Sequence, residues 1–466
     1  MNMQSRREFL LTGLGLGIAA WLQPGAAFAR PAAAFNAGAG RADIVFSADL
    51  YPLDGFTGER DALAVRVLLL DDGGTRMSIA VVDLTSIADQ MIGAIKAILA
   101  DVAGVAAENA LVCASHTFST PHIFSAGQAP AGTDLTRNAA ALRAVEAAMR
   151  RAATQAVAGL QPARLGFESG VSRVNVNRDV QTPHGWWLGA DDAGFADPFL
   201  GVLRIDRLDG KPLAILMNVA VQSSIMDGSQ RAAGGRLISA DLAGSAARYV
   251  EAHYGSDAVA LFLVGAAGDQ APYLQANRHV VNHDGGVGQI DMHEAGFMLV
   301  DLLGERLGAD VVRVAQRIVT QAGGPLEMRR ESIEVDSQRF APEDKPVGPV
   351  TSFNYRIGEK RRVPVILMRI GDMVLVGMQP ELSASIGAQI RAGSPYAQIM
   401  VATMVDGAAK YMPDARSYDR FTYEARNSPY AKGAAEAAAT AIVDKLKRMK
   451  DSNNRGELRC HHVGNS

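Results

Sequence analysis

Short apolar runs alternate with longer helical stretches along most of the chain. The runs with the β-branched and apolar character of strands are residues 63–70, 77–84, 110–115, 201–206, 212–221, 258–264, 365–370 and 373–378. The stretches with helical periodicity or composition are residues 135–160, 241–254, 293–315, 382–391 and 429–449. This alternation predicts an α/β fold in which mixed sheets are covered by helices.

Turn signals and polar segments divide this pattern. Asp209-Gly210 and Gly371-Asp372 each separate two strand runs and predict β-hairpins. Residues 338–362 are rich in proline and charge, which predicts an excursion over the surface. Residues 450–466 form a polar tail that we expect to be disordered. No internal repeat is visible, and we predict a single α/β domain over residues 30–449.

Residues 1–29 have the order of a bacterial signal peptide. Arg6 and Arg7 precede the apolar run of residues 9–22, and Ala27 and Ala29 place small residues before a cleavage site. The paired arginines indicate the twin-arginine export route. The apolar run is shorter than the ~20 residues that span a bilayer. We expect a periplasmic protein that has no transmembrane segment once the signal peptide is removed.

Composition narrows the class of protein. The chain has 466 residues, of which 48% are hydrophobic and 20% charged, as in a globular protein with a sizeable core. A formal net charge of −3 offers no basic field for nucleic acid. Cys113 and Cys460 are the two cysteines, and they are too few for a disulfide framework. We therefore expect a small-molecule or lipid partner.

Loops that adjoin the apolar runs hold nearly all of the unusual polar residues. These loops are residues 113–122, 218–224, 238–244, 264–272 and 377–381. Because polar groups at the strand ends of an α/β fold converge on a shared crevice, we expect one site here. Each residue also has a structural explanation. A histidine after a strand often bonds a backbone group, and Asp241 stands where it would cap a helix.

Taken together, these segments resemble the neutral, non-lysosomal ceramidases, which are zinc amidases of N-acylsphingosines. The resemblance runs through nearly the whole chain after the signal peptide. It rests on Asn175-Val176-Asn177-Arg178, Asp197 through Asp209-Gly210-Lys211-Pro212, Ser239 to Gly244, Gly268-Asp269 with Pro272, Pro380-Glu381, and Tyr411, Tyr418 and Tyr423-Glu424-Ala425-Arg426. The chain ends soon after the last of these motifs, so we expect it to lack the immunoglobulin-like domain that follows in those enzymes.

The resemblance implies a set of site residues, with departures. His116 matches the first zinc-binding histidine, Glu381 and Tyr411 match the remaining ligands, and Gln222 stands where a second ligand histidine is expected. Phe118 replaces a histidine that assists catalysis, and Ala271 replaces a serine, so a serine nucleophile cannot act from there. The implied metal set is therefore His116, Gln222, Glu381 and Tyr411, with zinc as the expected ion.

Further roles follow if a metal is bound. A metal-bound water becomes a usable nucleophile. His116 would take part in catalysis, Asp241 or Asp269 would orient ligands or take a proton, and Tyr411 would steady the developing oxyanion. Gln222 and an apolar surface would contact the substrate. The residues proposed for that surface are Phe118, Trp186, Trp187, Met226 and Tyr273, and ordinary core packing explains Met226 as well. His122, His283 and His293 are possible substitute ligands.

Three functions remain open on these residues. The first is a periplasmic metal-dependent hydrolase of an amide or ester bond in a hydrophobic substrate. The second is a catalytically degenerate fold that binds a lipid or saccharide, and the third is a metal-independent lyase that uses His116 as a base. The sharpest structural expectation belongs to the first function: His116 and Glu381 meet across one pocket, which Gln222, Asp241 and Tyr411 line, and lie within about 5 Å of each other if they share an ion.

Overall fold

The computed structural model describes residues 35–463 apart from 125–126, 256, 282–285, 341–347 and 352–354. The predicted signal peptide and His283 lie outside the described residues. Among the helices that the structure describes, none combines the length and apolarity needed to cross a bilayer.

The fold repeats one unit three times: three antiparallel strands, a helix, a fourth strand parallel to the third, and a second helix. The first unit is β1 (Asn36–Asp43), β3 (Ala64–Asp71), β4 (Arg76–Val82), α1 (Asp89–Ala103), β5 (Ala110–Ala114) and α2 (Leu135–Ala158). The second is β6 (Gln161–Val171), β9 (Phe199–Arg207), β10 (Pro212–Val219), α3 (Asp241–Tyr254), β12 (Val259–Val264) and α4 (Phe297–Ala315). The third is β17 (Leu326–Val335), β20 (Arg361–Ile370), β21 (Met373–Met378), α5 (Ala384–Gly393), β23 (Gln398–Ala402) and α8 (Ala434–Val463). This repeat is not visible in the sequence, because the three units have the same order and pairing of strands but no similarity in their amino-acid residues.

Two mixed sheets result from these units. The first two units join where β1 pairs with β6, which gives the order β12-β10-β9-β6-β1-β3-β4-β5. A short ninth strand, β16 (Gln321–Ala322), pairs with β6. The third unit forms its own sheet, β17-β20-β21-β23. In each unit the last strand pair is parallel and the others are antiparallel, which confirms the predicted mixed α/β class.

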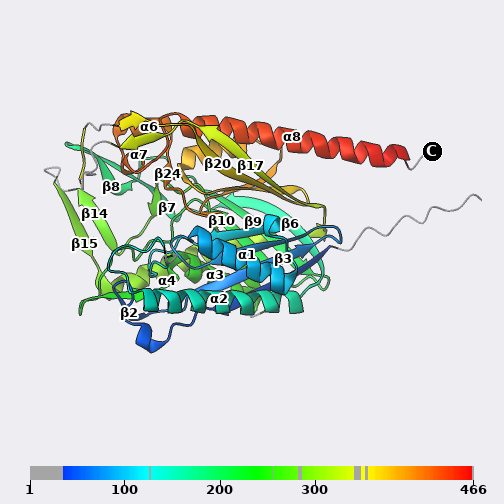
Figure 1. Cartoon of the computed structure of the whole chain (residues 1–466), viewed down its shortest axis with the longest axis horizontal. Helices are drawn as coiled ribbons and strands as arrows, with labels where there is room; N and C mark the ends of the chain where they lie inside the picture. The colour runs from blue at the N-terminus through cyan, green and yellow to red at the C-terminus, as the bar shows by residue number, and fades with distance from the viewer. Residues whose placement is uncertain are drawn as a thin grey trace, which may run out of the picture. The chain divides into compact units, whose positions relative to one another are not determined.

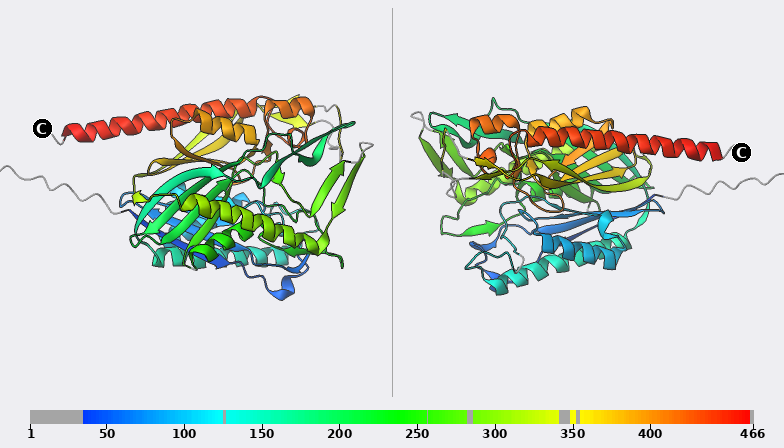
Figure 2. Two further views of the ribbon diagram at one scale, coloured as in Figure 1. Left: turned by 180° about the vertical axis from the view of Figure 1, so that it is seen from behind. Right: turned by 45° about the horizontal axis from the view of Figure 1, so that its top comes forward.

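The two sheets face each other and are covered by helices on their outer sides, so the fold has four layers (Figures 1 and 2). Side chains such as Leu68, Leu203 and Leu261 from one sheet pack against Met368 and Leu375 from the other. Helices α1 to α4 cover the large sheet, and α5 and α8 cover the small one. Because both faces of the strands are buried, runs such as β12 are apolar throughout rather than alternating.

The third and fourth strands of each unit end together at the edge where the site lies. In the three units, the chain leaving the fourth strand donates a backbone hydrogen bond to the last residue of the third. These bonds are Ser115 N to Val82 O at 2.9 Å, Gly265 N to Val219 O at 2.8 Å and Val405 N to Met378 O at 3.1 Å. The loops that follow are therefore brought together from distant parts of the sequence.

Insertions between the core strands and helices complete this edge. They contain β2 (Phe56–Glu59), β7 (Asn175–Thr182), β8 (Gly185–Asp191), β11 (Arg236–Ile238), β13 (Gln270–Pro272), β14 (Asn277–Val281), β15 (Val287–Asp291), β18 (Gln338–Phe340), β19 (Tyr355–Ile357), β22 (Glu381–Leu382), β24 (Tyr411–Met412), α6 (Ala415–Arg420) and α7 (Tyr423–Arg426), with short 3₁₀ turns at Ala48–Leu50, Ala107–Asn109 and His293–Gly296. Within the excursion expected at residues 338–362, β18 pairs with β19, and β20 already begins at Arg361.

The expectation of disorder from residue 450 is wrong for the residues that follow directly. Helix α8 continues past Met449 to Val463. Lys450 Nζ donates to the Pro395 carbonyl at 2.5 Å, and Asn453 Nδ2 donates to Glu327 Oε2 at 3.1 Å. These bonds hold the polar face of the helix against β17 and the end of α5, which a search for apolar periodicity cannot detect.

Candidate functional site

His116 lies just beyond β5, in a backbone conformation with a φ of +57°. Its Nδ1 contacts the carbonyl oxygen of Thr85 at 2.6 Å, and its Nε2 lies 3.2 Å from Glu381 Oε2. A carbonyl oxygen only accepts, so Nδ1 carries a hydrogen. The side chain is buried, and Nε2 faces the carboxylate. Contacts at both ring nitrogens thus fix the orientation of the His116 imidazole.

Glu381 and Gln222 complete a buried group around His116. Glu381 opens β22, and Gln222 lies beyond β10. Gln222 Nε2 donates to Glu381 Oε2 at 2.7 Å, so this one carboxylate oxygen contacts both Gln222 and His116. The expected meeting of His116 and Glu381 is confirmed. Tyr411 stands directly opposite Glu381 because β22 and β24 pair in parallel.

A close backbone approach sets the position of Glu381. Gly268 N donates to the Leu382 carbonyl at 2.8 Å. A Cβ atom at Gly268 would lie 2.9 Å from the carbonyl oxygen of Glu381 and 3.0 Å from that of Leu382. The absence of a side chain at this residue therefore allows the loop after β12 to support β22.

Arg178 is the residue of this group that the sequence analysis did not assign to the site. It lies on β7, where Nη1 donates to Gln222 Oε1 at 3.0 Å and Nε donates to Glu424 Oε1 at 2.7 Å. Its guanidinium carbon is 5.2 Å from the centre of the Tyr411 ring and 5.7 Å from that of Tyr423. The sequence did contain a signal for this ion pair. Two of the motifs that resemble the ceramidases each contain a charged residue, Arg178 in one and Glu424 in the other.

Burial and charge compete in this group. Burial lowers the pKa of His116, but the charge and hydrogen bond of Glu381 outweigh it, so the net shift is upward. Burial raises the pKa of Tyr411 far above its ordinary range, and the Glu381 charge adds to this. Tyr411 therefore remains a neutral phenol at neutral pH. Burial opposes the charge of Arg178, but Glu424, Tyr411 and Glu381 raise its pKa overall.

Behind Arg178 lie two buried carboxyl groups, Asp179 and Glu424. Burial raises the pKa of Asp179 well above its ordinary value, and the neighbouring Glu424 charge and hydrogen bond raise it further. Glu424, which is fully buried on α7, forms an ion pair with Arg178 at 2.7 Å.

Asp241 has a different environment from the one expected. It begins α3 with a φ of +48°, and its carboxylate accepts from the backbone N–H groups of Ile225, Met226 and Leu242 at 3.0, 2.9 and 2.6 Å. Burial raises its pKa to about 6, against the lowering effect of these bonds. The side chain therefore holds the loop that follows Gln222 rather than contacting Gln222 itself.

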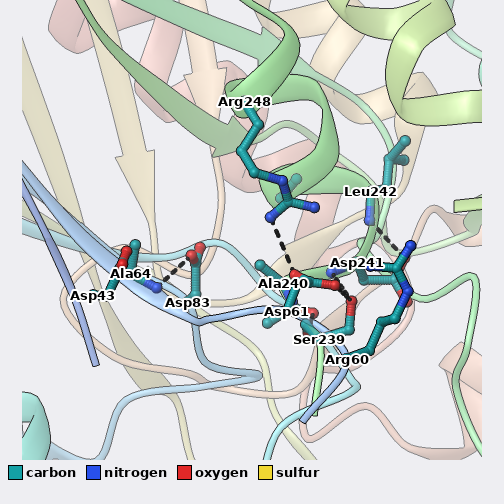
Figure 3. A network of polar contacts seen from close by, with 12 residues as sticks. Asp43, Arg60, Asp61, Ala64, Asp83, Ser239, Ala240, Asp241, Leu242 and Arg248 are labelled. Carbon is teal, nitrogen blue, oxygen red and sulfur yellow. Dashed lines mark hydrogen bonds and ion pairs between the residues drawn. The ribbon is translucent and has the colours of Figure 1, made fainter. Parts of the chain in front are cut away.

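A second carboxylate supports the segment before Asp241. Asp61 accepts from Ser239 Oγ at 2.6 Å, from the Ala240 N–H at 3.0 Å and from Arg248 Nη1 at 3.1 Å (Figure 3). Both sides of the turn into α3 are thus fixed by hydrogen bonds, and this rigid turn carries the loop that lines the site.

Asp269 links the end of β12 to the start of α5. Its carboxylate accepts from the Ala384 N–H at 2.8 Å and from Gln270 Nε2 at 3.1 Å. Burial raises its pKa to about 7, and these two bonds work against that shift. Asp269 positions the backbone around Glu381. Its expected part in proton transfer stays a prediction.

Comparison with solved structures identifies the fold. The neutral ceramidase of Pseudomonas aeruginosa superposes with a TM-score of 0.69 at 20% sequence identity, covering 90% of this chain and 75% of that one. The fold is that of a neutral ceramidase. A ceramidase complexed with C2 superposes with a TM-score of 0.68 at 21% identity, covering 90% and 76% of the two chains. No family model and no curated protein matches the sequence.

Within this ceramidase fold, Phe118 separates the buried group from a surface crevice. The Phe118 ring stands edge-on to the His116 ring, with centroids 4.7 Å apart. The same side chain lines a narrow crevice together with Phe56, Met226 and Phe297. Phe118 thus has the location expected of a substrate contact, and Met226 shares it.

Of the other aromatic and histidine residues, Trp187 is linked to the centre through the Tyr423 ring, which contacts Tyr411, and the remaining ones lie elsewhere. Tyr273 is exposed and lines a separate cavity of about 460 Å³ with Arg173 and Arg306, because β13 carries it to the far side of β7. Its expected contact with a substrate at the His116 centre is therefore not supported. Trp186 and Trp187 stack on Arg420 and Arg426. His122 pairs with Asp54, and His293 contacts the Gln230 carbonyl, so neither approaches Glu381.

The donor atoms at the centre do not fit the zinc ion that a ceramidase resemblance implies. Among the described residues, no three His, Cys, Asp or Glu side chains are grouped to hold a metal ion. Gln222 turns its amide nitrogen to Glu381 and its oxygen to Arg178. Tyr411 stays a neutral phenol, which is a weak ligand. His116 and Glu381 alone fall short of the three protein ligands of a catalytic zinc site.

Proposed function

We propose that the chain is a hydrolase that cleaves an amide or ester bond in a substrate with an apolar chain. The observation that carries this proposal is the buried contact of His116 Nε2 with Glu381 Oε2 at 3.2 Å. It brings an acid and a base into one pair beside a polar group and a crevice that apolar side chains line in part. Support also comes from the fold, since the two solved structures compared above are both named ceramidases.

The pair has the groups that hydrolysis requires. Glu381 takes a proton from a water molecule, whose oxygen attacks the carbonyl carbon of the substrate. His116, whose two ring nitrogens both face acceptors, gives its Nε2 proton to the leaving nitrogen or oxygen as that bond breaks. The proton on Glu381 then crosses to His116, which restores both groups. Atoms and charge balance without a covalent intermediate.

Two neighbours of the pair can stabilise the transition state. Negative charge develops on the carbonyl oxygen during attack, and fixed donors in a buried site lower its energy. Arg178 is a permanent cation, and Tyr411 keeps its phenolic hydrogen. Arg178 lies over the Tyr411 ring, and Tyr411 stands opposite Glu381. Their donors support an oxyanion-stabilising role for both in this proposal.

The crevice and the first residues of the chain complete the proposal. Apolar side chains of Phe56, Phe118, Met226 and Phe297 line the crevice together with Arg231, Arg236 and Glu294, which suits a substrate that joins a hydrocarbon chain to a polar group, as an N-acylated lipid does. We also propose that the protein acts in the periplasm, since Arg6 and Arg7 precede a short apolar run.

The test measures release of fatty acid from N-acylsphingosines of short and long acyl chain, and from a matched ester. Wild-type protein should release the acid, and Glu381→Gln should lower kcat about 10²–10⁴-fold, as expected for loss of an acid–base group. Gln321→Glu changes an exposed side chain on β16 and is the matched control. Equal rates for wild type and Glu381→Gln would rule out the pair as the catalytic centre.

A second candidate is a protein that binds an N-acylated lipid without cleaving it. The observation that favours it is Phe118, whose ring covers the His116 ring on the crevice side. Equilibrium binding of the same lipids with no product after prolonged incubation would support this function. Product formation by wild type would exclude it.

A further inference from the structure

We infer that the centre around His116 and Glu381 works without a bound metal ion, because Gln222 and Arg178 hold its ligand atoms in a continuous chain of hydrogen bonds. The inference deepens the proposed function by assigning the cofactor requirement of the same centre. It rests on that function for its chemistry, but metal binding is measured separately from hydrolysis.

The direction of each hydrogen bond in the chain is decided by its ends. A guanidinium only donates, so the atom of Gln222 that faces Arg178 Nη1 at 3.0 Å is its oxygen. The amide nitrogen then faces Glu381 Oε2 at 2.7 Å, where a carboxylate accepts it. If the amide were turned to offer its oxygen as a ligand, its NH₂ group would face the N–H donor of Arg178. Its oxygen would then face the carboxylate oxygen of Glu381, which is also an acceptor. The amide is therefore locked away from metal binding.

The distances between the side-chain atoms agree with these hydrogen-bond directions. Two ligands with bonds of 2.0–2.2 Å at a tetrahedral ion lie about 3.4 Å apart. The 3.2 Å between His116 Nε2 and Glu381 Oε2 would by itself allow either a metal ion bound by both atoms or a hydrogen bond between them. The 2.7 Å between Gln222 Nε2 and Glu381 Oε2 is a hydrogen-bond distance and is too short for two ligands of one ion.

Positive charge near Glu381 is already supplied by the protein. Arg178 is fixed by Glu424 at 2.7 Å and lies over the Tyr411 ring, two hydrogen bonds away from Glu381. Because the Gln222 oxygen accepts from this fixed guanidinium at 3.0 Å, it is not free to bind an ion beside Glu381.

Gln222 is consequently the residue that decides whether the centre binds a metal. Replacing it by histidine would give two imidazoles and one carboxylate, a donor set that holds catalytic zinc in other hydrolases. A histidine also removes the amide oxygen that accepts from Arg178. We expect Gln222→His to create a metal site and wild type to have none.

The experiment uses the processed protein, dialysed against a chelator and then titrated with Co²⁺ and Zn²⁺. Bound Zn²⁺ is counted by elemental analysis, and Co²⁺ is followed by its visible absorption. Wild type should bind neither ion. Gln222→His should bind about one equivalent with the absorption of a four-coordinate site, and His116→Ala with Gln222→His should lose it. Gln222→Leu, which removes the amide without adding a ligand, is the matched control and should bind neither.

The outcomes separate the two proposals. One equivalent of metal in wild type, lost in His116→Ala, would overturn the inference. Folded Gln222→His and Gln222→Glu that both fail to bind would overturn the role of Gln222, and Gln222→Glu also serves if the histidine variant does not fold. Metal-free wild type that does not hydrolyse would reject the proposed function alone. Hydrolysis that disappears as one zinc is removed would reject the inference alone.

Discussion

Gln222 and Glu381 hold equivalent positions in two copies of the same fold unit, and their side chains are hydrogen-bonded at 2.7 Å. Strand β10 ends at Val219 and β21 ends at Met378, so each residue is the third after its strand. The equivalent residue after β4 is Thr85, whose carbonyl oxygen accepts from His116 Nδ1. All three units therefore contribute the same loop position to one centre.

Loss of charge at Glu381 should separate its structural and chemical roles. In Glu381→Gln an oxygen remains for the Gln222 amide, but the charge-assisted bonds weaken, so we expect a loss of about 1–3 kcal/mol in unfolding free energy. Denaturant unfolding measures this. A stability equal to wild type would show that the His116 and Gln222 contacts contribute nothing to folding.

A side chain at Gly268 should displace Glu381. The added Cβ of Gly268→Ala would meet backbone carbonyl oxygens at 2.9 and 3.0 Å, and backbone cannot move aside as a side chain can. We expect a loss of about 2 kcal/mol or more and reduced activity. Gly93→Ala, in α1 with no atom within 4 Å of the new Cβ, is the control and should stabilise by roughly 0.5–1 kcal/mol. Equal effects of the two substitutions would contradict the close approach.

Removing the carboxylate of Asp241 should destabilise the protein before it affects chemistry. Asp241→Ala leaves three buried backbone N–H groups without their acceptor, each worth about 1–3 kcal/mol. Thermal and denaturant unfolding should show a loss of at least ~3 kcal/mol. Ser119→Ala, which removes a bond of 3.4 Å to the same carboxylate, should cost far less. An Asp241→Asn variant with wild-type stability and no activity would instead support a catalytic role.

Asp269 should make stability depend on pH. Its pKa is raised from 3.8 to about 7 on folding, so between these values the folded state binds a proton that the unfolded state has lost. Stability should therefore fall by a few kcal/mol, at about 1.4 kcal/mol per unit of pKa shift, as pH rises from about 4 to 7, and then level off. Urea midpoints at pH 5 and pH 8 should differ less in Asp269→Asn than in wild type. An unchanged difference would remove Asp269 as the cause.

Export should depend on the paired arginines. Replacing Arg6 and Arg7 by lysine keeps the charge but removes the pair that the twin-arginine route requires, so uncleaved precursor should accumulate in the cytoplasm. Cell fractionation and the size of the protein provide the measurement. Mature protein in the periplasm from the double variant would assign export to another route.

Local pattern was sufficient for much of the architecture. The helix at Asp241–Tyr254 has the predicted bounds, and the hairpin of β20 and β21 turns at Gly371-Asp372 as predicted. These elements were accessible because apolar runs and turn residues act through near neighbours in the chain. The continuation of α8 was not, since the residues directly after Met449 are polar and are held by bonds such as that of Asn453 to Glu327.

By itself, the sequence determined that the chain is an α/β protein with its unusual polar residues in the loops beyond its strands, and it predicted that His116, Gln222 and Glu381 belong to one centre. Their contact was decided by tertiary structure, which brings together side chains separated by up to 265 positions. Only the packed structure shows that the Asp241 carboxylate accepts hydrogen bonds from backbone N–H groups and that Arg178 donates a hydrogen bond to Gln222. The physical reason is that hydrogen-bond partners and burial depend on elements far apart in sequence, which no local pattern contains.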